Sequence, residues 1–317
     1  MRLFCLSLLL FFAPLLRATE PVSPERRAAM TDRALAYLVK QQKDSGQVGE
    51  SRPRAVTALF ILATLSAGHL PSDAVYGEAL TKAATWLTDN SSGAFLGGVD
   101  EPMADQALAA LALSQLVGTF TDKERNRKLY ERSKQALGYT LDAQDKGSNR
   151  KYTGGWRPTA RNSTNDRVLT TWCLFQLRAH KLNQERLSKS SLSRATDFVL
   201  ASQKAKAKGE DSELGGFAVG ADGLAVRSTS AAGLLTLVLF DGDKEKIALG
   251  RDWLLKHPPR WYGPHFYTTN FFAVRALWRA RRDDTKAFNK YFRRLLRLLR
   301  ERQNGDGSFP FPPGHGG

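Results

Sequence analysis

Two kinds of helix alternate along the chain, and the hydrophobic pattern distinguishes them. In residues 285–302 apolar side chains recur at the three-and-four spacing of one helix face, at Phe288, Phe292, Leu295 and Leu299. Residues 122–143 follow the same pattern. Both segments are therefore predicted to be amphipathic helices with one buried stripe and one face in water.

The second kind of helix is apolar on nearly every side. Five segments show it: 55–67, 104–117, 169–177, 230–240 and 269–278. A helix that is apolar all round is buried all round. Half-buried and fully buried helices in alternation predict two concentric layers, with the apolar helices inside. No run alternates in the manner of a strand, so the fold class is predicted to be all-α.

A unit of roughly 50 residues recurs, and internal repeats of this kind decide the architecture. Each unit has an amphipathic helix that ends in Leu and then Gln or a similar residue, a glycine-rich loop with an aromatic residue, and an apolar helix. Examples are Leu38 with Gln41, Leu141 with Gln144, and Leu200 with Gln203. Glycine allows a positive φ after a helix end, and a glutamine amide can satisfy the groups that the helix end exposes.

These loops resemble the prenyltransferase and squalene-oxidase repeat of the terpenoid-cyclase and protein-prenyltransferase superfamily. Gln303 to Phe309 is similar to the Gln…Asp-Gly-Ser-Trp motif of that repeat, with Phe309 in place of Trp. The resemblance covers residues 28–310 and implies an α/α toroid of five to six helical hairpins around a central cavity. Because Pro-rich residues 310–317 stand where a sixth inner helix is expected, both a closed and an incomplete ring are consistent with the sequence.

The catalytic signatures of that superfamily are not matched. Asp241-Gly-Asp-Lys and Asp283-Asp284 differ from the Asp-x-Asp-Asp motif of squalene cyclases. Aligning Cys173 on the zinc-binding segment of the protein prenyltransferases places Asn165 where the resemblance requires His. Asn is a poor zinc ligand beside His and Cys. The sequence therefore predicts no metal and no cofactor, and Cys173 is interpreted as a core residue.

The beginning of the chain predicts export. Arg2 precedes an apolar run from Leu3 to Leu16, and Ala18 suits the position before a cleavage site. We expect a signal peptide over 1–18, with an uncleaved anchor as the alternative, and a secreted or periplasmic protein. The remaining domain assignments are a linker over 19–27, the toroid over 28–310 and a flexible tail over 311–317.

The residues just before each inner helix are the candidate site, because in a ring they gather at one mouth of the cavity. There, free helix N–H groups and convergent polar side chains favour a ligand. The candidate residues are Arg54, Asp105, Asp166, Arg167, Arg227, His265 and Tyr267. The alternative for each of them is a helix cap or a salt bridge in a loop.

Two classes of function fit this description. The first is a non-catalytic exported toroid that binds an apolar small molecule in the cavity, or a partner. The alternative is an enzyme of the same ring class, either an isoprenoid cyclase relative or a lyase or hydrolase acting on an acidic polysaccharide. The sequence leaves open whether the protein is an enzyme.

Positive charge is concentrated near the end of the chain. The formal net charge is +16, and residues 279–302 contain ten Lys or Arg against three acidic residues. The apolar stripe of the last helix is expected to face the ring, which leaves Arg293, Arg294, Arg297 and Arg300 in solvent. These four define the basic flank, which is interpreted either as a solvated face or as a surface for anionic lipid or an acidic polymer. The export signal argues against nucleic acid as a partner.

Replacing the four arginines of the basic flank by Gln is expected to abolish binding to anionic vesicles at low salt. Each cation near such a surface contributes about 1 kcal/mol at most, and salt screens it within about 8 Å. Vesicle sedimentation at low and physiological salt measures the effect. Undiminished binding by the quadruple variant would show that the flank only keeps the protein soluble.

Overall fold

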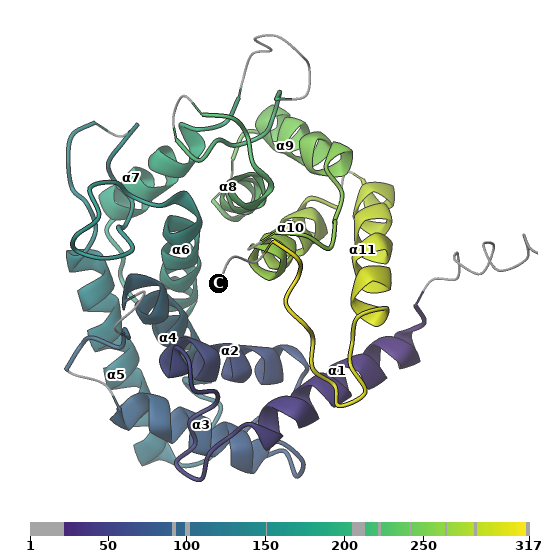
Figure 1. Ribbon diagram of the computed structural model, residues 1–317. Helices are drawn as coiled ribbons and strands as arrows, with labels where there is room; N and C mark the ends of the chain where they lie inside the picture. Colours follow the sequence, from purple (N-terminus) through teal and green to yellow (C-terminus); the bar gives the residue numbers. More distant parts are fainter. Residues whose placement is uncertain are drawn as a thin grey trace, which may run out of the picture.

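Helices follow one another around a ring, alternately on its outside and its inside, in the computed structural model (Figure 1). The structure describes residues 22–90, 93–98, 102–149, 151–204, 213–220, 223–240, 242–263, 265–281 and 284–314. In this part of the chain the only β-type pairings are isolated bridges, so the fold is an all-α toroid as predicted.

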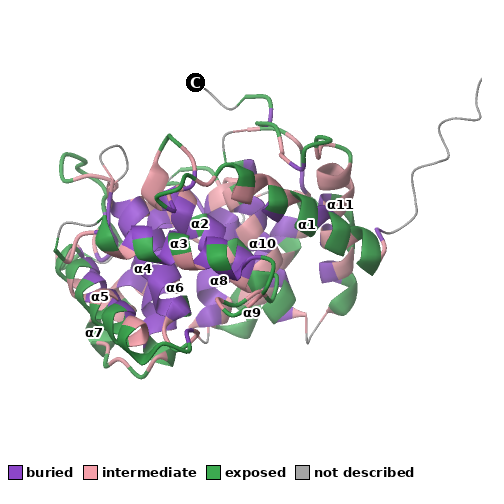
Figure 2. Cartoon of the chain, turned by 90° about the horizontal axis from the view of Figure 1, so that it is seen from below, coloured by how far each residue is buried: buried purple, intermediate pink, exposed green. Residues whose placement is uncertain are grey.

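The two predicted layers are present. The outer layer consists of α1 (Pro24–Lys40), α3 (Gly77–Asp89), α5 (Lys123–Asp142), α7 (Lys189–Leu200), α9 (Lys244–Lys256) and α11 (Thr285–Arg300). The inner layer consists of α2 (Pro53–Ser66), α4 (Pro102–Leu116), α6 (Arg167–Leu182), α8 (Arg227–Leu239) and α10 (Phe266–Ala280). Buried residues concentrate in the inner helices, whereas exposed residues cover the outer ones (Figure 2).

A glutamine at the end of an outer helix joins each of four loops to the next outer helix. Its amide nitrogen donates one hydrogen bond to a glycine carbonyl in its own loop and one to a carbonyl of the following outer helix, at 2.8–3.4 Å. The four residues are Gln42, Gln144, Gln203 and Gln303. In the first unit Gln42 takes this position, whereas the sequence pattern indicated Gln41, which is instead the C-cap of α1.

Glycine is required where these loops meet the next helix. Gly307 has a φ of +95°, and a Cβ added there would overlap the backbone carbonyl of Arg33 in α1. Gly215 has a φ of +86° and lies in the same way against Leu249 in α9. Non-glycine residues rarely adopt this conformation, so these positions need glycine for both conformation and space. We call each pair of glutamine and glycine a glutamine–glycine joint.

The last joint closes the outer layer. Gln303, just after α11, donates to the Met30 carbonyl in α1 at 2.8 Å, and Arg33 donates back to Gln303 at 2.7 Å. The inner layer has no sixth helix among the described residues. Residues 301–314, which we call the C-terminal strap, instead run inward from α11 to the start of α10 (Figure 1). The ring is therefore closed on its outside and incomplete on its inside.

The ends of the domain differ from the sequence-based boundaries. The predicted signal peptide, residues 1–18, lies outside the described residues. Helix α1 begins at Pro24 with Ser23 as its N-cap, so residues 24–27 belong to the toroid and not to a linker. At the other end, Pro313 in the predicted tail accepts a hydrogen bond from Gly263 at 2.8 Å, so the strap is attached to the ring.

Helix α11 has the predicted amphipathic arrangement, with two differences. Phe288 and Leu295 are buried, but Phe292 and Leu299 are only half-buried. Arg293 and Arg294 are exposed, whereas Arg297 and Arg300 are half-buried rather than fully exposed. No helix in the described part of the chain is long and apolar enough to cross a membrane.

Changing Gly307→Ala is expected to lower the free energy of unfolding by about 1–3 kcal/mol, because a non-glycine residue at this φ is strained and its Cβ meets α1. Gly305→Ala is the matched control, since a Cβ there has no atom within 4 Å, and its effect should stay within about 0.5 kcal/mol. Urea denaturation followed by circular dichroism compares the two. Equal stability of the two variants would contradict the role assigned to the last joint.

Candidate functional site

A large cavity lies between α2 and α10, where the described residues form no sixth inner helix. It has a volume of about 860 Å³ and is lined by α2, α4, α6, α10 and α11, with one residue from α1. We call it the central groove. Outer helix α11 reaches this groove directly with Phe292, Leu295 and Leu299, because no inner helix in the described part of the chain covers its apolar stripe.

The lining of the central groove is mostly aliphatic and aromatic. From α2 it includes Leu59, which is 44% exposed even though it belongs to an inner helix. Across the groove Phe271 of α10 stacks on the indole of Trp172, with ring centroids 5.0 Å apart. The walls are therefore apolar faces of well-packed helices, and the groove is shaped before any ligand enters it.

Arg275 is the one charged side chain among the described residues that line the groove. Its guanidinium lies 4.6 Å from the ring centroid of Phe271 and 5.1 Å from that of Phe175. Burial lowers the pKa of Arg275, and the nearby charge of Arg279 adds to the effect. An arginine in a protein nevertheless stays protonated, so a positive charge remains in this apolar site.

Two further polar side chains of the lining, Asn270 and Tyr267, support the structure of the groove. Asn270 donates to the Phe266 carbonyl at 2.7 Å and accepts from the Tyr291 hydroxyl at 2.8 Å. Tyr267 donates to the Pro310 carbonyl of the C-terminal strap at 2.7 Å, and burial raises its pKa to about 12. Tyr267 therefore stays protonated at neutral pH and attaches the strap over the N-terminal end of α10.

Three of the predicted mouth residues stabilise helix ends and loops. Asp166 is the N-cap of α6 and accepts from the Leu169 amide at 2.6 Å. Asp105 is buried in the first turn of α4 and forms an ion pair with Arg52 at 2.5 Å. Arg54 donates to the carbonyl of Asn90 at the end of α3.

The other four predicted residues lie at the starts of α6, α8 and α10. Arg167 is buried over the ring of Phe198, and burial lowers its pKa. Arg227 begins α8, and His265 is the exposed N-cap of α10 without a side-chain capping bond. Of the seven, only Tyr267 lines the central groove. Sequence reasoning missed Arg275, which does line the groove. The signal for it was a single cation within the otherwise apolar segment 269–278.

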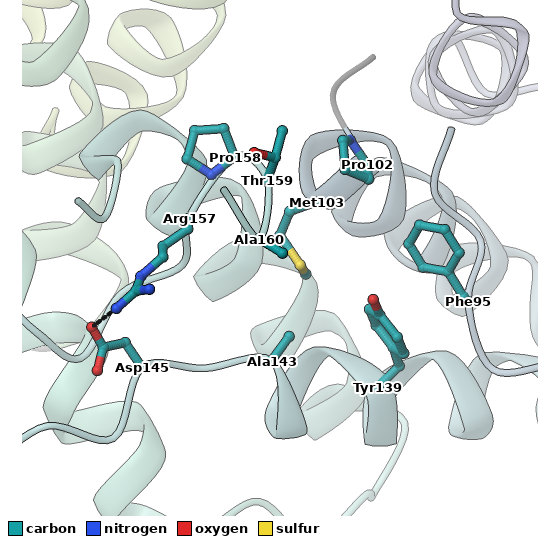
Figure 3. Close-up of a pocket in the computed structure, with 10 residues that line it drawn as sticks. All are labelled: Phe95, Pro102, Met103, Tyr139, Ala143, Asp145, Arg157, Pro158, Thr159 and Ala160. Atoms are coloured by element: carbon teal, nitrogen blue, oxygen red, sulfur yellow. Dashed lines mark hydrogen bonds and ion pairs between the residues drawn. The ribbon is translucent and has the colours of Figure 1, made fainter. Parts of the chain in front are cut away.

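A second, smaller pocket of about 360 Å³ lies between the loop before α4 and the loop before α6 (Figure 3). Phe95 and Tyr139 line one side, with ring centroids 4.9 Å apart, and an ion pair of Arg157 with Asp145 at 3.4 Å lines the other. We call this the Asp145 pocket. Asp145 is the only carboxylate among the described residues that line it.

Several effects act on the charge of Asp145. Burial works to raise its pKa, but hydrogen bonds from the Gly147 amide, Asn165 and Arg157 outweigh it, so that the pKa lies below its usual value. Asn165, which the superfamily alignment placed at a zinc-ligand position, donates to Asp145 at 2.9 Å. Cys173 is buried in α6, and burial raises the pKa of its thiol well above the usual value. Asp145 is therefore ionised at neutral pH, whereas Cys173 is an inert core residue.

In the described part of the chain, no group of three or more His, Cys, Asp or Glu side chains is arranged to hold a metal ion.

Comparison with known proteins gives a likeness of fold. No protein-family model matches the chain, and no curated protein matches it either. Among solved structures, a GH76 alpha-mannanase of Bacteroides thetaiotaomicron is similar, with a TM-score of 0.59 and 14% sequence identity over 90% of this chain and 87% of the other. This likeness supports the toroid and leaves membership of the terpenoid-cyclase superfamily as a prediction.

Proposed function

We propose that this protein binds an apolar small molecule in the central groove without changing it chemically. The observation that carries the proposal is that the described residues form no sixth inner helix, which leaves apolar faces of α2, α10 and α11 around a cavity of about 860 Å³. Small-molecule sites in proteins have volumes of roughly 300–1,000 Å³ and are lined mainly by apolar side chains.

Exposed apolar surface in the groove is the physical reason to expect a ligand. Each Å² of apolar surface that a ligand removes from water contributes roughly 25 cal/mol. Leu59 and the half-buried Phe292 present such surface inside the ring, where residues of this type are ordinarily covered. An apolar ligand covers these side chains without requiring new backbone hydrogen bonds.

The groove lining also favours binding over catalysis. Acid–base catalysis requires a group whose pKa lies near the working pH and which reaches the substrate. Among the described lining residues, Tyr267 has a pKa of about 12 and Arg275 remains a cation. Neither group exchanges protons readily at neutral pH.

A hydrolase acting on a polysaccharide is the second candidate. Two observations favour it: the similar solved toroid is an alpha-mannanase, and the Asp145 pocket combines aromatic rings with an ionised carboxylate. Glycoside hydrolysis ordinarily uses a pair of carboxyl groups, one of them protonated. Asp145 fits the ionised member of such a pair, and the described residues of its pocket provide no second one.

Filling the groove should block binding. Ala63 lies in the groove wall on α2, and Ala63→Trp is expected to weaken binding of the uncharged fluorescent probe N-phenyl-1-naphthylamine at least tenfold, because the indole occupies the cavity. Ala29→Trp on the exposed face of α1 is the matched control and should bind as the parent does. A parent protein that shows no saturable probe binding would refute the proposal.

The second candidate predicts that reducing ends are released from α-mannan or from a polyuronate such as polygalacturonate. Asp145→Asn should then reduce the rate at least a hundredfold, whereas Asp142→Asn, at an exposed position at the end of α5, should leave it unchanged. A reducing-sugar assay measures both variants. If the parent releases nothing from either polymer, the hydrolase reading is wrong for these substrates.

A further inference from the structure

Arg275, which lines the central groove, has two further arginines near it, Arg279 and Arg178, neither of which is part of the groove lining. Arg275 and Arg279 are four residues apart on α10 and so share one face of that helix. Arg275 reaches across to α6, where its guanidinium lies 5.1 Å from the ring centroid of Phe175. Arg178 follows Phe175 by three residues on the same side of α6. The charge of Arg279 acts on Arg275 and that of Arg178 acts on Arg279, so the three guanidinium groups lie near one another; we call them the arginine cluster.

The arginine cluster has no countercharge within the described part of the chain. None of the ion pairs between described residues involves Arg178, Arg275 or Arg279. Burial lowers the pKa of Arg279, and the charge of Arg178 lowers it further, as expected for neighbouring cations. Bringing like charges together is unfavourable unless an anion joins them.

The dipole of the inner helices explains only part of this arrangement. Cations are favourable in the last turn of a helix, which accounts for Arg279, and Arg178 donates to the Leu239 carbonyl at the end of α8. Arg275 is five residues before the end of α10 and lies on aromatic rings inside the groove. The end of α10 therefore provides no partner for the charge of Arg275. A ligand in the groove lies where it can provide one.

We propose that the ligand of the central groove is a single-chain amphiphile whose anionic head, a carboxylate or a phosphate, binds the arginine cluster; this rests on the proposed function. Guanidinium groups bind both kinds of head through paired, charge-assisted hydrogen bonds. The apolar chain lies along Phe271 and the wall of α2. It points toward the end of the groove where Tyr267 holds the C-terminal strap.

Ligands that share one chain and differ in the head group test the proposal. Dodecanoate, dodecyl phosphate and uncharged dodecanol are compared below their micelle-forming concentrations, by displacement of N-phenyl-1-naphthylamine from the full protein. The expected result is that at least one of the two anions binds tenfold or more tightly than dodecanol. The stronger of the two identifies the head group, and acetate and inorganic phosphate show what the head contributes alone.

Substitutions in the cluster locate the head group. Arg275→Gln and Arg279→Gln are each expected to reduce the affinity for the preferred anion at least tenfold while leaving the affinity for dodecanol within twofold. Arg275→Lys retains the charge and should restore much of the loss. Arg26→Gln, on the exposed face of α1, is the matched control and should bind both ligands as the parent does.

The outcomes separate this proposal from the one on which it rests. Equal affinities for dodecanol and both anions, unchanged by either cluster substitution, overturn the arginine cluster as a head-group site and leave apolar binding intact. Failure of all three ligands to bind overturns both proposals. Circular dichroism establishes that each variant is folded, and Arg279→Gln, at an exposed position, decides the question if Arg275→Gln does not fold.

Discussion

The glutamine–glycine joint is the interaction on which the rest of the toroid depends. One primary amide has two donors, and in each joint they bind a carbonyl of the loop and a carbonyl of the next outer helix. The glycine beside it allows the two backbones to approach where any side chain would collide. In the second unit Gln106 of α4 connects the loop at Leu96 to Ala136 of α5 instead. Because these bonds link outer helices, the outer layer closes without a complete inner layer.

The central groove is a consequence of that closure. The last joint connects α11 to α1 although the chain provides no sixth inner helix among its described residues. The apolar stripe of α11 and the facing sides of α2 and α10 then remain around a cavity, and the C-terminal strap spans one end of it. Elsewhere in the ring a neighbouring helix covers such apolar faces, but at this position no described helix does. The same feature that makes the inner layer incomplete therefore creates the central groove.

The sequence was informative about the layers and less so about the site. Helix periodicity identified inner and outer helices, because burial on one side or on all sides leaves a direct mark on composition. Periodicity placed the first joint at Gln41 instead of Gln42, because the end of a helix can shift by one residue without changing the hydrophobic pattern. It also selected Asp105 and Asp166, which cap or pair at helix ends, because a cap and a ligand group have the same sequence signature. Leu59 and Phe271 were indistinguishable from core, since only the missing neighbour exposes them.

The chemistry of the two cavities separates binding from catalysis more sharply than the fold does. A toroid shared at 14% identity with a mannanase fixes the ring and not its reaction, since function depends on the side chains placed on a fold. A catalytic pair needs two titratable groups whose surroundings move their pKa values apart. In the central groove the one charged side chain of the described lining, Arg275, keeps its proton, so it can hold an anion but cannot relay a proton. The Asp145 pocket contains an ionised carboxylate, but its described lining residues include no second carboxyl group that could act as the acid. The described carboxylate that a hydrolytic reaction needs is therefore found in the Asp145 pocket, whereas the central groove offers a single cation on apolar walls.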